Sequence, residues 1–163
     1  MKRNNLLPKL DQKVRFEYAK VEDFSMQKGN GMFAGKVIFN PTILLTNLQT
    51  RINQRTTHVN HMWIMASLNV LEKNLHIGDT ISFTARIMKY EKMDANSNLM
   101  ITDVGFDFIQ NINVISSETN GKSLYQYFRK CLYRNDVIIS DKYLNWIYKN
   151  ITTQENCKSV IKN

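Results

Sequence analysis

The chain has 163 residues, of which 43% are hydrophobic and 22% charged, which is typical of one globular domain with a tail and not of a disordered chain. Its formal net charge is +8, which favours polyanionic partners such as nucleic acid. No apolar run approaches the roughly 20 residues needed to cross a bilayer, so we expect no membrane partner.

The charge is unevenly distributed along the chain. Residues 122 to 163 hold eight lysines and arginines against three acids, so the last quarter supplies five of the eight net positive charges. Cationic side chains gain affinity for a polyanion because they release counterions from its phosphates. The distribution favours a nucleic-acid partner, although a basic surface can also serve only to keep protein molecules apart.

The amino terminus and the cysteines indicate the compartment. The first residues, MKRNNLLPKLDQK, have a basic start but only Leu6 and Leu7 where a secretory signal peptide needs a longer apolar region. We therefore expect a cytoplasmic protein. Cys131 and Cys157 form no CxxC pair, and we expect both to be ordinary reduced thiols.

The first third of the chain predicts two strands joined by a turn. Residues 14–24 alternate apolar and polar side chains, as a strand does. The glycine-rich residues 25–31 predict a turn or a flexible hairpin tip. Residues 32–45 predict a second strand that Asn40-Pro41 breaks or redirects. The polar run 46–57 predicts a loop or a short irregular element.

The middle of the chain predicts three more strands and a short helix. Residues 59–65 have strand character, and residues 67–75 can form a helix with Ser67 as N-cap. A Gly-Asp turn then opens the clearest strand, residues 80–90, and a hydrophilic loop separates it from residues 99–116, which form one long strand or two short ones interrupted near Gly105. In the strand 80–90 the alternation predicts four core residues, Ile81, Phe83, Ala85 and Ile87.

Beyond Gly121 the period becomes helical. Ser123 and Gln126 form a capping-box pattern, and Leu124, Phe128, Cys131 and Leu132 share one helical face. A second helix begins near Ser140-Asp141. We expect a basic helical hairpin over residues 122–152 and a frayed tail over residues 153–163.

Five strands with a helix between the third and the fourth follow the order of the OB-fold, a small Greek-key barrel. The segment "LHIGDTISFTARIMKYEK", residues 75 to 92, and the preceding "VNHMWI" resemble the entry of such barrels. The resemblance covers residues 12–117. It implies a mainly β protein, a five-stranded OB-like barrel with C-terminal helices, that binds ligands on its second and third strands and the flanking loops.

No catalytic pattern is present. The sequence contains no G-x-S-x-G, H-E-x-x-H, Walker A or Rossmann glycine motif, and its acids are scattered. His58 and His61 stand three residues apart, which in a strand separates them onto opposite faces, and we expect His61 in the core with Val59, Trp63 and Met65. We therefore expect a protein that is not an enzyme, with no catalytic residue, no metal site and no cofactor.

The sequence does supply the residue types that hold single-stranded nucleic acid, which are cations for the backbone and aromatic rings for the bases. The predicted nucleic-acid-binding residues are Lys36, Arg51, Arg55, Trp63, Arg86, Lys89, Tyr90 and Lys92. A secondary basic surface is predicted on the helical hairpin at Arg129, Lys130 and Arg134.

The sequence thus predicts an accessory protein that binds single-stranded DNA or RNA, in a setting such as replication or recombination of a mobile element. A protein-interaction adaptor, or an inhibitor acting on a nucleic-acid enzyme, is the alternative, because tyrosine, tryptophan and arginine are enriched at protein-protein hot spots and the helical hairpin is rich in them. A small hydrolase or nuclease that uses the scattered acids is a third.

Overall fold

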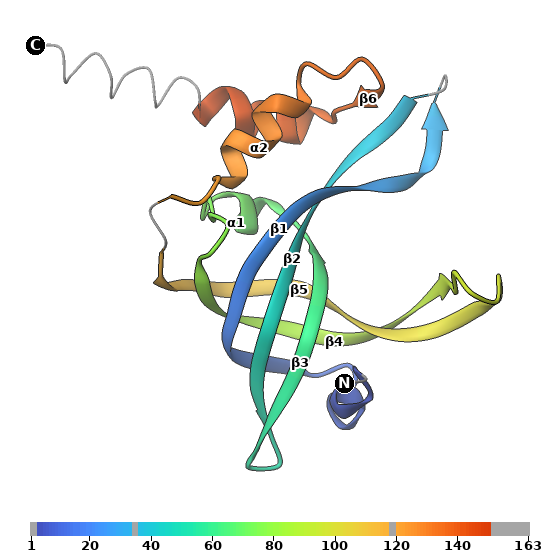
Figure 1. Cartoon of the computed structure of the whole chain (residues 1–163), viewed down its shortest axis with the longest axis vertical. Coiled ribbons are helices and arrows are strands. Elements are labelled where there is room, and N and C mark those ends of the chain that lie inside the picture. Colours follow the sequence, from blue (N-terminus) through green and yellow to red (C-terminus); the bar gives the residue numbers. More distant parts are fainter. Residues whose placement is uncertain (1–2, 34–35, 118–119, 151–163) are drawn as a thin grey trace, which may run out of the picture.

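The computed structural model describes residues 3–33, 36–117 and 120–150, and within these ranges the side chains of all but residues 27–39. Five long antiparallel strands lie in the order β3-β2-β1-β4-β5 (Figure 1). They are β1 (Lys13–Phe33), β2 (Lys36–Ile52), β3 (Arg55–Met65), β4 (Thr80–Met93) and β5 (Met100–Ser116). A short strand, β6 (Val137–Ile138), pairs in parallel with β2. The mainly β class with C-terminal helices is confirmed.

Within the described ranges, four helical segments accompany the sheet. They are the 3-10 helix η1 (Arg3–Lys9), α1 (Leu68–Leu71), α2 (Leu124–Cys131) and residues 141–150. The predicted capping box of α2 is formed. The backbone N–H of Gln126 donates to Ser123 Oγ at 3.1 Å, and the backbone N–H of Ser123 donates to Gln126 Oε1 at 3.0 Å. In the described part of the chain, no helix combines the length and apolarity needed to span a membrane.

The described sheet does not close into a barrel. Among the described strands, β3 and β5 form the two ends of the hydrogen-bonded order and do not pair with each other. Helix α1 stands at this opening, where Asn69 Nδ2 donates to the Ile109 carbonyl at 2.7 Å and so ties α1 to β5. The strand order and the position of α1 agree with the OB-like expectation. The sheet stays open between β3 and β5.

Two hairpins extend beyond the sheet as arms. The β4–β5 arm comprises residues 88–93 and 100–105, where β4 and β5 pair only with each other. The β1–β2 arm comprises residues 27–33 and 36–40. Both arms project on the same side of Figure 1, where the β1–β2 arm runs up beside β6. The turn or flexible hairpin tip predicted at residues 25–31 is misplaced, because β1 continues through these residues to Phe33.

Strand β2 continues through Pro41, although the sequence predicts that Asn40-Pro41 breaks or redirects it. Ala66, the residue after β3, donates to the Pro41 carbonyl at 2.9 Å. In an antiparallel strand the N–H and the C=O of one residue point the same way, so the amide that proline lacks would face the end of β3 and not β1. Pairing of β2 with β1 at Met26 is therefore preserved.

The polar run 46–57 is not a loop. Strand β2 continues to Ile52, Asn53 and Gln54 make a two-residue turn with φ of 49° and 65°, and β3 begins at Arg55. Two central residues with positive φ are the mark of a type I′ hairpin turn, whose twist matches the strands on either side. The polar residues of this run form the exposed face of a hairpin whose other face buries Leu48 and Ile52.

The core joins the sheet to the helices. Three rings from three strands lie at its centre, with Phe16 5.0 Å from Phe83 and 4.6 Å from Phe106. The four residues predicted as core in β4 are buried. Around α2, the Phe24 ring of β1 lies 5.8 Å from Tyr127, and Trp146 of helix 141–150 lies 6.1 Å from Tyr125. Helix α2 therefore packs on β1, and helix 141–150 packs on α2.

Candidate functional site

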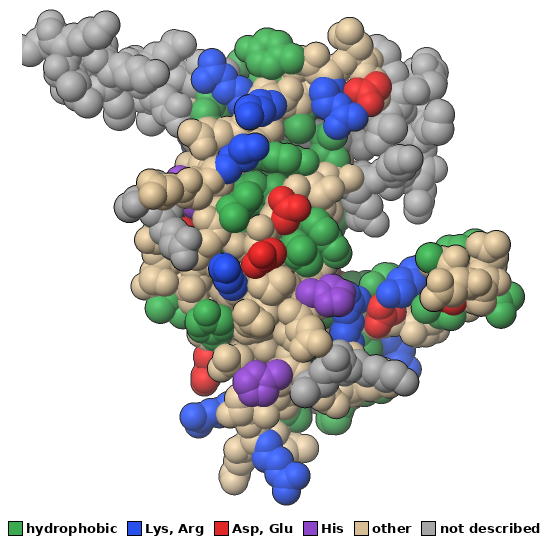
Figure 2. All heavy atoms as spheres, viewed as in Figure 1, with side chains coloured by type: hydrophobic (Ala, Val, Ile, Leu, Met, Phe, Trp, Pro, Cys, Tyr) green, Lys and Arg blue, Asp and Glu red, His purple; other side chains and the backbone are tan. Residues whose placement is uncertain are grey.

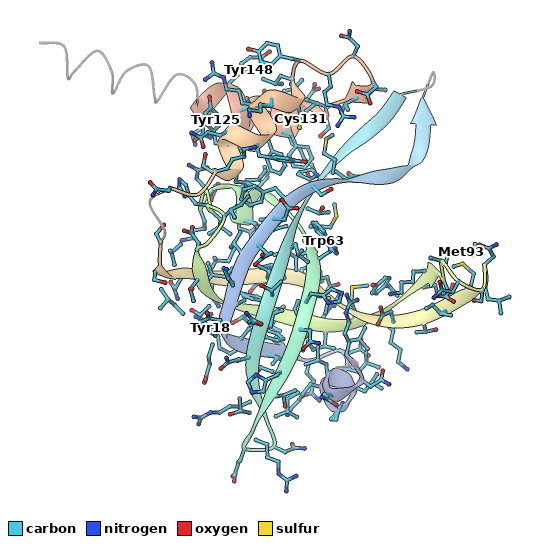
Figure 3. The ribbon with its side chains drawn as sticks, viewed as in Figure 1. Tyr18, Trp63, Met93, Tyr125, Cys131 and Tyr148 are labelled. Atoms are coloured by element: carbon cyan, nitrogen blue, oxygen red, sulfur yellow. The ribbon has the colours of Figure 1, made fainter. Side chains whose placement is uncertain are left out.

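A groove of about 610 Å³ is lined by η1 and all five long strands, including the base of the β4–β5 arm. Figure 3 shows Trp63 between the two arms. The groove is lined by Arg3, Ser25, Met26, Thr42, His61, Met62, Trp63, Ile64, Met65, Met88, Tyr90, Lys92, Gly105 and Phe106. It therefore combines three aromatic rings, several methionines, one histidine and two cations.

Trp63 reaches the groove because the alternation of β3 shifts by one residue. Val59, Met62 and Ile64 are buried, whereas His61 is exposed and the Trp63 side chain is 44% exposed. The shift occurs opposite Asn47, whose φ of 54° lies in the left-handed region that bends a strand. The prediction that His61 and Trp63 share the core with Val59 is wrong, since both residues are exposed and line the groove.

Tyr90 is held in place from two sides. Its ring covers Gly105 on the neighbouring strand, where an added Cβ would lie 3.0 Å from two ring carbons. Its hydroxyl accepts a hydrogen bond from Arg3 Nη1 at 3.1 Å. Glycine in a strand often marks such a close approach. Tyr90 is therefore a pre-positioned ring whose orientation depends on Gly105 and on the N-terminal segment.

Asp103 connects the two cations of the groove. Its Oδ2 atom accepts from Arg3 Nη1 at 3.0 Å and from Lys92 Nζ at a shorter distance. Burial by itself would raise the pKa of the Asp103 carboxyl, but the hydrogen bonds from Lys92 and from the Val104 amide, together with the charge of Arg3, lower that pKa below its ordinary value. One carboxylate against two cations leaves the cluster with one net positive charge.

We expect the Asp103→Asn variant to be less stable than the parent protein at pH 7, by an amount that shrinks below about pH 4. The folded-state pKa of Asp103 is depressed, so its contribution is complete above the unfolded-state pKa and is lost as the pH falls through the folded-state pKa. Urea unfolding of both proteins at pH 7 and at about pH 3 measures this difference.

The matched control for Asp103 is Asp136→Asn, which breaks the exposed ion pair between Arg134 and Asp136. Exposed pairs contribute little to stability, so this variant should unfold almost like the parent at both pH values. A stability difference for Asp103→Asn that does not change with pH would contradict the role assigned to this carboxylate.

Of the eight predicted nucleic-acid-binding residues, the structure brings three into the groove, which are Trp63, Tyr90 and Lys92. Arg86 lies elsewhere, where its guanidinium makes two hydrogen bonds to Asp107 and stacks on the Phe108 ring at 4.3 Å. This pairing leaves Arg86 poorly placed to attract a phosphate.

The other predicted cations are dispersed. Arg51 and Arg55 stand exposed beside the β2–β3 turn, where Arg55 lines a separate hollow of about 740 Å³. Lys89 is exposed and does not line the groove. Lys36 begins β2, and its side chain lies outside the described residues.

The sequence reading missed Arg3, His61 and the groove methionines. No local pattern marks Arg3, because its partner Asp103 lies 100 residues away along the chain. Periodicity assigned His61 to the core, and methionine has no pattern that separates a groove wall from a core. The one usable signal was the shared face of Met88, Tyr90 and Lys92 in β4.

The secondary basic surface is partly re-assigned. Arg129 and Lys130 line a hollow of about 450 Å³ on α2 together with Lys122, Gln126 and Tyr133. We call these five residues the α2 patch. Arg134 is not among them, because its guanidinium is paired with Asp136 at 3.0 and 2.6 Å.

In the part of the chain that the structure describes, no three His, Cys, Asp or Glu side chains converge on a position that could hold a metal ion. Cys131 is a buried residue of α2, and burial raises the pKa of its thiol, as expected for a packed and unreactive cysteine. Compared with known proteins, the chain matches no protein-family model, no curated protein and no solved structure.

Proposed function

We propose that this protein binds single-stranded nucleic acid in the groove and does not act on it chemically. The observation that carries the proposal is the convergence of Trp63 and Tyr90 with Arg3 and Lys92 in one groove. Bases stack on aromatic rings with about 1–3 kcal/mol each, while cations follow the backbone. The rings come from β3 and β4, which are elements with fixed neighbours on the sheet.

The groove walls suit a ligand without a fixed base sequence. Met26, Met65 and Met88 line the groove around Trp63. Methionine side chains are flexible and polarizable, so they adapt to rings of different shape. Sequence-tolerant binding of this kind fits an accessory role in replication or recombination, where a protein must accept many different strands.

Fluorescence anisotropy with labelled single- and double-stranded oligonucleotides of equal length, measured across a salt series, tests the proposal. We expect the single strand to bind more tightly than the duplex, with an affinity that falls as salt rises. Equal or tighter duplex binding, or no binding at about 50 mM salt, would contradict single-strand recognition. Mg²⁺-dependent cleavage of the oligonucleotide would contradict a purely binding function.

An adaptor function is the second candidate, and the tip of the β4–β5 arm favours it. Met93, Leu99, Met100 and Ile101 are exposed there, and Figure 3 shows Met93 at the far end of the arm. Exposed apolar side chains gathered at one place often mark a protein contact. If no oligonucleotide binds at low salt, this arm becomes the better candidate for the working surface, with an adaptor or inhibitor role.

A further inference from the structure

The α2 patch is a second surface with the residue types that bind polyanions. Helix α2 buries Leu124, Phe128 and Cys131 against the rest of the core. The patch residues stand on the opposite side of the helix, because positions three, four and seven apart share a face. Figure 2 shows Lys and Arg side chains gathered over the helices at the top of the view.

The charge balance of the patch differs from that of the groove. Lys122, Arg129 and Lys130 line the patch hollow, and no acidic residue lines it among the described residues. In the same part of the chain, none of these three cations belongs to an ion pair. The groove cluster carries one net positive charge, whereas the patch carries three, so the groove is the weaker of the two in attracting phosphate.

Tyr133 adds an aromatic ring to the patch. Its side chain is 78% exposed and lines the same hollow as the three cations. A tyrosine packed for stability would bury most of its ring, as Tyr125 does on the other side of α2. A ring beside cations on an open surface is the combination that single strands use.

Strand β1 links the patch to the groove. Ser25 and Met26 line the groove, and the preceding residue, Phe24, contacts Tyr127 and Phe128 of α2 through its ring. Helix α2 is therefore fixed to the strand that forms one wall of the groove.

We propose that the α2 patch binds the backbone phosphates of a single strand that extends beyond the groove. The groove then supplies stacking and the patch supplies most of the charge attraction. The proposal rests on the groove function, because both surfaces would hold the same nucleic-acid strand. It predicts that the patch contributes to binding only when the oligonucleotide is long.

The test compares two triple variants on a short and a long single strand, of about 8 and about 30 nucleotides, chosen to lie within and well beyond the usual span of one such fold. The patch variant is K122A/R129A/K130A. The control is K9A/K13A/K73A, which removes the same charge from three lysines that do not line the patch hollow. Affinity falls as salt rises, and losing three phosphate contacts should make the slope of log affinity against log salt less steep by about 2. Binding of the long strand should weaken about tenfold or more at low salt.

We expect the patch variant to bind the short strand like the parent and the control variant to bind both strands nearly normally. Equal losses for the two triple variants would overturn the proposal, because only the total charge would then matter. A patch variant that loses short-strand and long-strand binding equally would overturn it as well. Circular dichroism and thermal unfolding check that both variants are folded.

The same experiment separates this proposal from the groove function through Trp63→Ala. If Trp63→Ala weakens short-strand binding while the patch variant binds the long strand normally, the groove stands and the patch is overturned. If Trp63→Ala has no effect while the patch variant loses long-strand binding, the patch is supported as a polyanion site and the groove function is contradicted.

Discussion

Replacing Trp63 with alanine should lower the affinity for a single-stranded oligonucleotide about 5-fold to 150-fold, the range that corresponds to losing one stacked base of about 1–3 kcal/mol. Trp63 lines the groove from β3, and its side chain is 44% exposed. Because the indole carries no charge, the salt dependence of binding should stay nearly the same.

Two further variants control this prediction. Trp63→Phe keeps a ring and should retain part of the affinity. Phe108→Ala removes a ring of similar exposure, 59%, that does not line the groove, and it should bind like the parent protein. Anisotropy titrations at one fixed salt concentration compare the three variants. Normal binding by Trp63→Ala would move the site away from the groove.

Phe83→Ala should lower the free energy of unfolding by about 3–5 kcal/mol, which is a large part of the stability of a chain of this size. The Phe83 side chain is fully buried, and its ring lies 5.0 Å from Phe16 and 6.1 Å from Phe106. These rings come from β1, β4 and β5, so the cavity left by alanine opens at the joint of three strands.

Urea unfolding followed by circular dichroism measures this loss, and Phe108→Ala again supplies the matched control. Phe108 lies on the strand paired with β4, but its ring faces solvent and contacts Arg86. Its removal should cost less than about 1 kcal/mol. Phe83→Leu should be destabilised less than Phe83→Ala, which keeps the prediction testable if the alanine variant does not fold. Similar losses for Phe83→Ala and Phe108→Ala would contradict the aromatic core.

The sequence predicted elements well where local chemistry alone decides them. The capping box at Ser123 begins α2 as expected, and the alternation after Gly78-Asp79 marks β4 and its core face. It failed where exposed strands look polar. The run 46–57 looks like a loop because its outward residues are hydrophilic, although the buried Leu48 and Ile52 on the other face keep the strand period.

The site was only partly predictable, because the sequence shows which side chains are charged but not which of them are already paired and so less able to bind a ligand. Arg86 is cationic in the sequence but is paired with Asp107 across two strands, and Arg3 meets Asp103 from the other end of the fold. No local pattern reveals such pairs, since strand register brings the partners together. The same register placed Trp63 and Tyr90 in one groove.

By itself the sequence determined the mainly β class, the core of β4, the start of α2 and the basic character of the C-terminal region, because each depends on residue type and local period. The tertiary structure alone decided which face of β3 is exposed, which cations are neutralised by carboxylates and which rings share the groove. These features depend on contacts between residues that are distant in the chain, and a one-residue shift opposite Asn47 is enough to turn Trp63 from the core to the groove.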